Sequence, residues 1–154
     1  MTAAQRPAVR HQCGPTHFEE TRNGYATAGV DAQVDAFIDN MAGAYAWADL
    51  VVCRAGALTL AELCAVGVAA ILVPFPAAVD DHQTHNAAAL VEHGAAQLVA
   101  EGDRFAERLA EVLTPMLGGA DCRARLLAMA NAARSLARPD AAVRIADACL
   151  ETAA

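Results

Sequence analysis

The feature that most constrains the fold is the alternation of continuous apolar segments with helical segments along the chain. Stretches 49–53, 68–75 and 95–100 are apolar at nearly every position rather than at every second one. Strands of this kind are typical of a parallel sheet that helices cover on both faces. The connections are short, which favours consecutive strand–helix–strand units. The sequence therefore predicts an α/β fold with a parallel sheet, flanking helices and a helical C-terminal tail.

Glycine and proline mark the ends of several predicted elements. Pro15 opens a helix that Gly29 closes, Gly67 ends a second helix, and Gly94 is the C′ residue of a third. The predicted strands span 8–13, 30–38, 49–53, 68–75 and 95–100. The predicted helices span 15–29, 40–48, 57–67, 81–94, 103–117, 121–137 and 139–153. Because no repeat or low-complexity linker interrupts this pattern, we expect a single domain over 1–154.

Composition excludes several classes of partner. The net charge is −7, and no basic stripe with interleaved aromatic residues occurs, which argues against a nucleic-acid partner. No apolar run approaches the ~18–20 residues of a membrane span, and the first residues lack a signal-peptide core, so we expect a cytosolic chain. The cysteines are odd in number and none is spaced C-x-x-C, which predicts buried free thiols rather than disulfides or a zinc site. They are Cys13, Cys53, Cys64, Cys122 and Cys149.

Ligands of open parallel sheets bind at the carboxyl ends of the strands. Three strand-to-helix loops end there, at 37–40, 54–57 and 74–83. The third is longer than the usual connection of about 2–6 residues and holds most of the polar loop side chains. We therefore expect the functional residues in these loops and in the first turns of the helices that follow them.

The stretch RAGALTLAE predicts an anion-binding helix start. The helix begins near Ala57, so the backbone N–H groups from Gly56 to Thr59 lack helical acceptors and carry the positive end of the helix dipole. Gly56 lets a ligand approach the backbone closely, and Glu62, one turn further, could accept hydrogen bonds from two sugar hydroxyls. Alternatively, Arg54 only pairs with a nearby acid and Glu62 is a solvated helix residue. The local pattern leaves both interpretations open.

The stretch DDHQTHNA opens another helix, with Asp80 or Asp81 as its N-cap. Gln83 and Asn86 lie three residues apart on one face and could present amides to neutral hydroxyls. His82 follows the cap directly. The stretch FIDNM offers apolar side chains and backbone amides that could hold a flat base, or a simple core contact.

Motifs for cofactors and metals are missing. No G-x-G-x-x-G follows a strand and no G-x-x-x-x-G-K-[ST] occurs, so we expect neither a dinucleotide cofactor nor an ATPase loop. Asp81, His82 and His85 have a spacing that could ligate a metal, but no second cluster accompanies them. The sequence therefore predicts no metal site and no cofactor.

Taken together, the loops resemble the donor-binding domain of the MurG family, bacterial UDP-GlcNAc transferases with a GT-B fold in glycosyltransferase family 28. The matching stretches are 11–14, 37–63, 73–75 and 80–87. The resemblance covers essentially the whole chain and weakens after Asp103. It implies a Rossmann-like parallel sheet that forms the C-terminal half of a GT-B fold and lacks its first strand.

The resemblance assigns the nucleoside to two places. The backbone of Ile38, with Phe37 and Met41 beside it, would meet the uracil of UDP-GlcNAc. Glu62 would bind the ribose hydroxyls.

The resemblance assigns the diphosphate to the helix start after residue 53. Gly56, Ala57 and Leu58 would face the diphosphate, and Arg54 would support that loop. Backbone N–H groups are the main donors in this arrangement.

The sugar is assigned to the following helix. Gln83, with His82 before it, would contact the GlcNAc hydroxyls, and Asn86 would help to hold that helix. No catalytic residue is expected in this chain, because the general base of the family is in an N-terminal half that the chain lacks.

The implied reaction is an inverting transfer in peptidoglycan synthesis. The C4 hydroxyl of the MurNAc on lipid I attacks the anomeric carbon of GlcNAc, UDP leaves, and lipid II forms. Lipid I and the inner face of the cell membrane would meet this chain only through the missing half, which makes the full enzyme a peripheral protein. The alternatives are a non-catalytic UDP-sugar-binding subunit or degenerate fragment that needs a partner chain, and a related glycolipid synthase, against which the long match at 37–63 counts.

Overall fold

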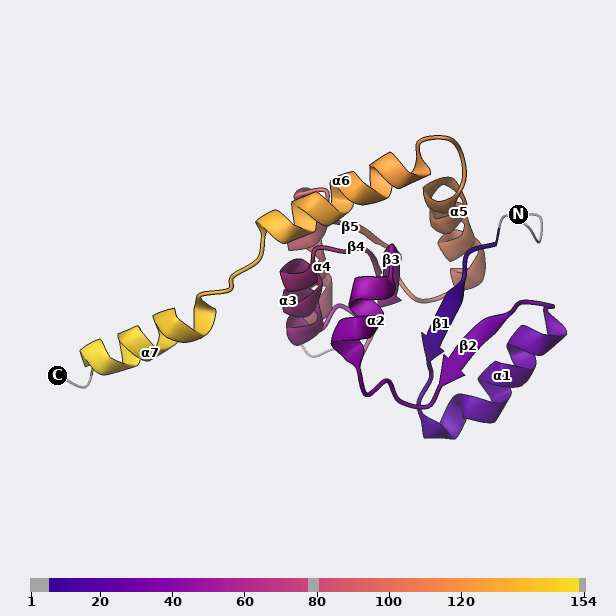
Figure 1. Ribbon diagram of the computed structural model, residues 1–154, viewed down its shortest axis with the longest axis horizontal. Coiled ribbons are helices and arrows are strands. Elements are labelled where there is room, and N and C mark those ends of the chain that lie inside the picture. The colour runs from indigo at the N-terminus through magenta and orange to yellow at the C-terminus, as the bar shows by residue number, and fades with distance from the viewer. Residues whose placement is uncertain (1–5, 78–80, 153–154) are drawn as a thin grey trace. The chain divides into compact units, whose positions relative to one another are not determined.

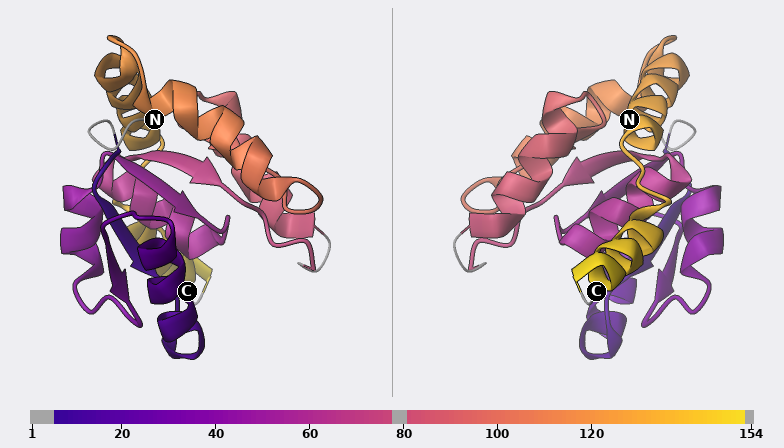
Figure 2. Two further views of the ribbon diagram at one scale, coloured as in Figure 1. Left: turned by 90° about the vertical axis from the view of Figure 1, so that its right-hand side faces the viewer. Right: turned by 90° about the vertical axis from the view of Figure 1, so that its left-hand side faces the viewer.

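The computed structural model describes residues 6–77 and 81–152, which fall into two compact units. Unit 1 is Met1–Trp47 and unit 2 is Ala48–Ala154, and each is described by itself. Their elements can be followed in Figure 1 and, from two further sides, in Figure 2. The expectation of a single domain over 1–154 stays a prediction.

Unit 1 is built on a pair of parallel strands. Its elements are β1 (Val9–Gln12), the short 3-10 turn η2 (Pro15–His17), α1 (Phe18–Thr27), β2 (Ala32–Asp35) and α2 (Met41–Trp47). β1 pairs with β2 in register, from Val9 opposite Ala32 to Gln12 opposite Asp35. The Arg10 Nε donates to the Asp35 carboxylate at 2.7 Å, which adds an ion pair between the two strands.

Unit 2 contains a three-stranded parallel sheet in the order β3-β4-β5. Its elements are β3 (Leu50–Cys53), α3 (Ala57–Val66), β4 (Ala69–Leu72), α4 (His82–Glu92), β5 (Ala96–Leu98), α5 (Phe105–Leu117), α6 (Cys122–Ser135) and α7 (Ala141–Thr152). All four residues of β4 are buried. Because successive strand residues point to opposite faces, this means that both faces of the sheet are covered. The predicted α/β fold with parallel strands and flanking helices is confirmed.

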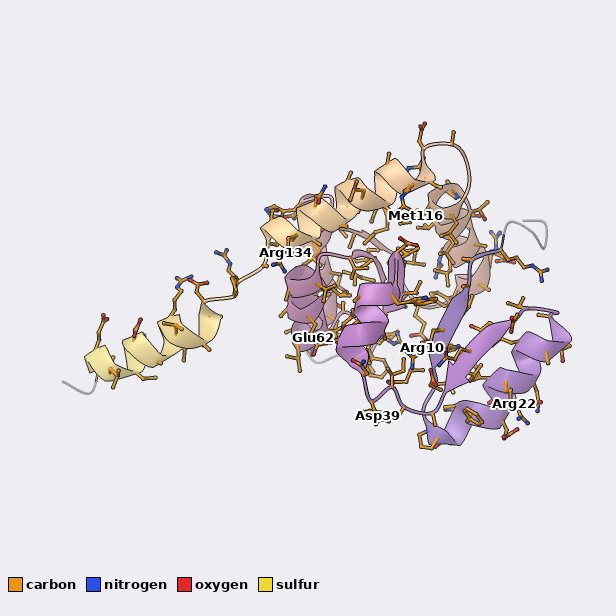
Figure 3. All side chains as sticks on the ribbon, viewed as in Figure 1. Arg10, Arg22, Asp39, Glu62, Met116 and Arg134 are labelled. Atoms are coloured by element: carbon orange, nitrogen blue, oxygen red, sulfur yellow. The ribbon has the colours of Figure 1, made fainter. Side chains whose placement is uncertain are left out.

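The core of unit 2 lies between the sheet and the helices that follow it. Ile71 of β4 is fully buried and clusters with Val99, Met116 and Met129. Met116, labelled in Figure 3, comes from α5, and Met129 comes from α6. The last helix, α7, buries none of its residues. This cluster is therefore made of the sheet with α5 and α6, and buried residues of α3 and α4, among them Leu63 and Ala87, add to the core.

The glycine-marked helix ends are confirmed. Gly67 follows α3 with φ +75°, and its N–H donates to the Leu63 carbonyl. Gly94 stands at C′ of α4 with φ +70°. Both conformations are left-handed, which suits glycine because it has no Cβ.

All five strands are shorter than predicted, most of all those at 30–38 and 68–75. The stretch 30–38 contributes only Ala32–Asp35, and 68–75 contributes only Ala69–Leu72. In the second case Val73 still donates to the Cys53 carbonyl, but Pro74 has no N–H with which to continue the ladder. In the first case the Ile38 N–H bonds to a side chain instead of a strand.

Strands β1 and β3 each have a single strand partner among the described residues, β2 and β4 respectively.

The cysteines form no disulfide in the part of the chain that the structure describes, but the prediction that they are buried is only partly right. Cys64 is buried, Cys149 is exposed, and the other three lie between these extremes. Burial raises the pKa of the Cys53 thiol to about 11. Cys149 lies on α7, which buries none of its residues. It is therefore exposed, although cysteine is an apolar residue that is usually buried.

The Arg10–Asp35 pair predicts a pH effect in unit 1. The hydrogen bond from Arg10 is the main cause that lowers the pKa of the Asp35 carboxyl, and Gln33 adds a weaker bond. A lowered folded-state pKa stabilises the fold above the ordinary pKa, and this stabilisation disappears as the pH falls through the lowered value, below about pH 4. In Arg10→Leu we expect the Asp35 midpoint, followed by carboxyl NMR, to return to its usual range. Gln33→Leu should raise it less, and an unchanged midpoint in Arg10→Leu would contradict the assignment.

Candidate functional site

The N-terminus of α3 is open at the carboxyl end of β3. Gly56 is the N-cap residue with φ −70° and ψ 139°, and the first helical bond runs from the Leu60 N–H to the Gly56 carbonyl. Within the described residues, the N–H groups of Ala57, Leu58 and Thr59 have no acceptor. The Leu58 side chain is 75% exposed. These N–H groups can therefore meet an anion from solvent, with the positive end of the helix dipole behind them.

Two amide side chains of α4 hold the residue that leads into α3. The Gln83 Oε1 accepts the Ala55 N–H at 3.2 Å and the Phe75 N–H at 3.0 Å. The Asn86 Nδ2 donates to the Ala55 carbonyl at 3.3 Å. Ala55 itself is fully buried. Both backbone groups of Ala55 are thus fixed by α4, and the direction in which α3 starts is fixed with them.

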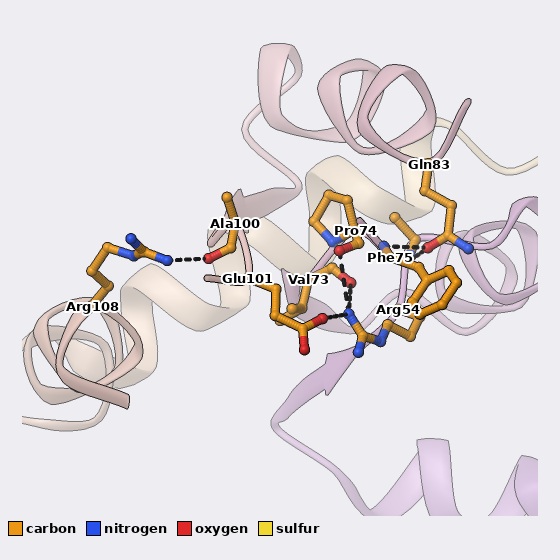
Figure 4. Close-up of polar contacts among 9 residues, drawn as sticks. Arg54, Val73, Pro74, Phe75, Gln83, Ala100, Glu101 and Arg108 are labelled. Carbon is orange, nitrogen blue, oxygen red and sulfur yellow. Dashed lines mark hydrogen bonds and ion pairs between the residues drawn. The ribbon is translucent and has the colours of Figure 1, made fainter. Parts of the chain in front are cut away.

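Arg54 ties together the loops that follow three strands, as Figure 4 shows. Its Nη1 donates to the carbonyls of Val73 and Pro74 at 3.4 and 3.2 Å, and pairs with the Glu101 carboxylate at 2.5 Å. Its guanidinium lies over the Phe75 ring, 5.3 Å from the centroid. Arg54 therefore does pair with a nearby acid, and it also supports the backbone of residues 73–74. A role in ligand binding stays a prediction.

Glu62 and His82 occupy the positions expected for them on the helices. Glu62 lies in the second turn of α3, where Figure 3 labels it. Its side chain is partly buried. His82 is exposed at the first position of α4. Their contacts leave the binding and the structural interpretations of both residues open.

The start of α4 differs in detail from the predicted N-cap. Asp81 does stand at the N-cap position, but in a left-handed conformation with φ 51°. Its carboxylate accepts the Thr84 hydroxyl at 2.6 Å and makes no capping bond to a backbone N–H of α4. Asp80, the other candidate, lies outside the described residues. No group of three His, Cys, Asp or Glu side chains within 6–77 and 81–152 is placed to hold a metal ion.

In unit 1 the predicted base-binding loop follows β2. Phe37 is 69% exposed, Ile38 is 7% exposed, and Met41 is partly buried at the first position of α2. The Ile38 N–H donates to the Gln12 Oε1 at 2.9 Å. The loop therefore places an exposed aromatic ring beside a buried residue whose N–H already has an acceptor.

The structure brings the predicted residues together in two groups, one in each unit. Unit 2 gathers Arg54, Gly56, Ala57, Leu58, Gln83 and Asn86 around the start of α3, and unit 1 gathers Phe37, Ile38 and Met41. Sequence reasoning missed three side chains that position them, Gln12, Phe75 and Glu101. The stretch 11–14 is one of those that resemble the family, but no local pattern indicates that Gln12 bonds to residue 38.

An open hollow of about 970 Å³ lies on unit 1. Arg6, Arg10, Asn40 and Trp47 are among the residues that line it. None of the predicted donor-binding residues contributes to its wall. Its size therefore gives no support to the predicted site, which rests on the loops at the strand ends.

The class of protein is an α/β protein, because its strands pair in parallel and helices flank them. Residues 2–145 match the family described as glycosyltransferase family 28 C-terminal domain, and the chain belongs to this family.

Relatives with curated names agree with this family. The chain is 57% identical to a protein of Marinobacter nauticus over 99% of the chain and 41% of the relative, and 60% identical to one of Xanthomonas axonopodis pv. citri over 94% and 33%. Each is called UDP-N-acetylglucosamine--N-acetylmuramyl-(pentapeptide) pyrophosphoryl-undecaprenol N-acetylglucosamine transferase. The crystal structure of Acinetobacter baumannii MurG superposes with a TM-score of 0.85 at 41% identity, over 97% of this chain and 46% of that one. The resemblance to the MurG family is confirmed, and the chain spans less than half the length of these relatives.

The contacts of Gln83 predict a specific effect on stability. Gln83→Leu leaves the buried Ala55 N–H and the Phe75 N–H without an acceptor, which should lower the free energy of unfolding by about 1–3 kcal/mol. Gln83→Glu keeps an acceptor oxygen and should cost less. Urea unfolding measures both.

Gln33→Leu at an exposed position serves as a matched control for the loss of one amide side chain, since the Gln33 side chain bonds to Asp35 alone among the described residues. Equal unfolding free energies for Gln83→Leu, Gln83→Glu and Gln33→Leu would show that Gln83 does not hold the two loops.

Proposed function

We propose that this chain is the donor-binding part of a glycosyltransferase that moves GlcNAc from UDP-GlcNAc to lipid I, giving lipid II. The family and the names of the relatives support this reaction. The observation that carries the donor site is the open N-terminus of α3, which α4 holds through both backbone groups of Ala55.

The diphosphate would bind at the N–H groups of Gly56, Ala57 and Leu58. When the bond between the anomeric carbon and UDP breaks, negative charge grows on the departing diphosphate. Backbone donors that are already fixed in place stabilise this charge without rearranging, which is the usual source of electrostatic catalysis. The buried contacts of Ala55 supply that rigidity.

The nucleoside would use the loop after β2 and the second turn of α3. The exposed Phe37 ring can cover one face of the uracil, and Met41 can border it. The Ile38 backbone would meet the hydrogen-bonding edge of the base. The Glu62 carboxylate can accept bonds from both ribose hydroxyls, since a carboxylate has two acceptor oxygens.

The sugar would meet the start of α4. Because the Gln83 Oε1 already accepts two backbone N–H groups, the group it can offer to a GlcNAc hydroxyl is its Nε2, a donor. His82 is exposed beside it. Asn86 uses its Nδ2 on the Ala55 carbonyl, which supports a positioning role rather than contact with the sugar.

The attacking groups would come from a part of the protein outside this chain. The C4 hydroxyl oxygen of the MurNAc forms the new bond, the bond to UDP breaks with inversion, and a general base in that part takes the hydroxyl proton. The same part would carry the lipid acceptor and contact with the inner face of the membrane. No helix of the described residues is long and apolar enough to cross a membrane.

A second candidate is a non-catalytic UDP-sugar-binding subunit that acts with a partner chain. The proposed residue roles favour this candidate, because each residue assigned above would bind or position the donor and none would act as a base. Turnover of lipid I by the 154-residue chain alone would contradict it and would place the base in this chain.

Titration with UDP tests the donor site through Gly56. A Cβ at this position would meet nothing closer than the Thr59 Oγ1 at 3.9 Å, and φ is −70°, so Gly56→Ala should fold with a stability within about 1 kcal/mol of the wild type. A diphosphate held against this backbone would collide with the new methyl group, so we expect UDP affinity to fall at least about tenfold. Calorimetry measures the affinity.

Gly24→Ala is the control, because a Cβ at Gly24 in α1 meets nothing within 4 Å and lies far from the predicted diphosphate residues in sequence. Glu62→Ala should weaken UDP and remove the preference for UDP over 2′-deoxy-UDP, which isolates the ribose contact. Unchanged UDP binding in both Gly56→Ala and Glu62→Ala would reject the donor site.

A further inference from the structure

Glu101 lies in the loop after β5, and two backbone contacts hold the residues just before it. The Val99 N–H donates to the Leu72 carbonyl at 3.0 Å, next to the end of β4. The Ala100 carbonyl accepts the Arg108 Nη2 of α5 at 2.6 Å, a contact that Figure 4 shows. The place of Glu101 at the carboxyl end of the sheet is therefore fixed without its own side chain.

The Glu101 carboxylate reaches the loops after β3 and β4 through Arg54. It pairs with the Arg54 Nη1 at 2.5 Å, and the same nitrogen donates to the Val73 and Pro74 carbonyls. The guanidinium lies 5.3 Å from the centroid of the Phe75 ring. An ion pair whose side chains are 47% and 40% exposed adds little to stability by itself. What the carboxylate does is orient a guanidinium that holds residues 73–75.

The same loop reaches the predicted sugar site through Phe75. Its N–H donates to the Gln83 Oε1 at 3.0 Å, and this oxygen also accepts the Ala55 N–H at 3.2 Å. The amide of a glutamine is planar, so donors that fix its oxygen also fix the direction of the Nε2 on the same carbon. The position of residues 73–75 therefore controls where Gln83 presents its donor group.

We propose that Glu101 is a positioning residue for the sugar half of the donor, because it orients Arg54 on the loop that orients Gln83. This role rests on the proposed function, which places the GlcNAc hydroxyls at Gln83. Glu101 needs no contact with the donor. The diphosphate should depend less on this loop, because the Ala55 carbonyl keeps its bond to Asn86 when residues 73–75 shift.

Two other roles for Glu101 predict different results. A role in stability alone would change the free energy of unfolding and leave the ratio of the affinities for UDP-GlcNAc and UDP unchanged. A purely electrostatic role, in which the carboxylate repels the donor diphosphate, would make the loss of Glu101 tighten both ligands by the same factor. The ratio of the two affinities therefore separates positioning from both of these roles.

The test titrates the 154-residue chain with UDP-GlcNAc and with UDP in four forms, namely wild type, Glu101→Leu, Glu101→Gln and Glu19→Leu. In Glu101→Leu we expect the affinity for UDP-GlcNAc to fall at least about threefold relative to that for UDP. Glu101→Gln keeps an oxygen that can accept from Arg54 and should lose less. Glu19→Leu is the matched control, because Glu19 pairs with Arg22 on α1 at 2.6 Å, and it should keep the ratio.

A double-mutant cycle tests the route through Arg54. Because Arg54→Met removes the guanidinium, adding Glu101→Leu to it should change the ratio of affinities no further. A further fall as large as in the wild-type background would show that Glu101 does not act through Arg54, and would overturn the inference.

A ratio in Glu101→Leu equal to that of the wild type would also overturn the inference, while binding of both ligands by the wild type upholds the donor site. Absence of binding by the wild type would instead refute the proposed function, and the inference with it. Amide hydrogen exchange gives a test that needs no ligand. The Phe75 amide should exchange faster in Glu101→Leu than in the wild type, and equal rates would contradict the role of Glu101 in holding this loop.

Discussion

The predicted donor site depends on the contact between α4 and Ala55. One residue receives a hydrogen bond at its carbonyl from Asn86 and gives one from its N–H to Gln83, and it is fully buried between them. The next residues are Gly56 and the first turn of α3. This contact therefore sets the direction in which the backbone N–H groups of that turn point. Gln83 also takes the Phe75 N–H, which couples the loop after β4 to the same point.

The electrostatics of this region come from the backbone rather than from basic side chains. The chain carries a net charge of −7, and the one arginine in the loop, Arg54, is paired with Glu101. The positive potential at the start of α3 therefore arises from its unbonded N–H groups and the helix dipole. In the proposed function, backbone donors of this kind would stabilise the leaving diphosphate.

The parts of the structure that could be predicted from the sequence depend on local chemistry. Gly67 and Gly94 mark helix ends because a left-handed residue is a property of that residue alone, and the start of α3 after Gly56 follows from the apolar pattern around it. The parts that could not be predicted depend on distant partners. Within the predicted strand 30–38, Ile38 bonds instead to the Gln12 side chain, 26 positions away, and Arg54 meets Glu101, 47 positions away. Gln83 was assigned to the sugar alone, since nothing in its surroundings indicates that its oxygen holds two loops.

The most direct test of the central claim is an amide NMR titration of the 154-residue chain with UDP. If the start of α3 binds the diphosphate, the largest chemical-shift changes will fall on the amides of Ala57 and Leu58, while those of α6 stay unchanged. Changes confined to the hollow of unit 1, around Arg10 and Trp47, with the first turn of α3 unaffected, would contradict the account.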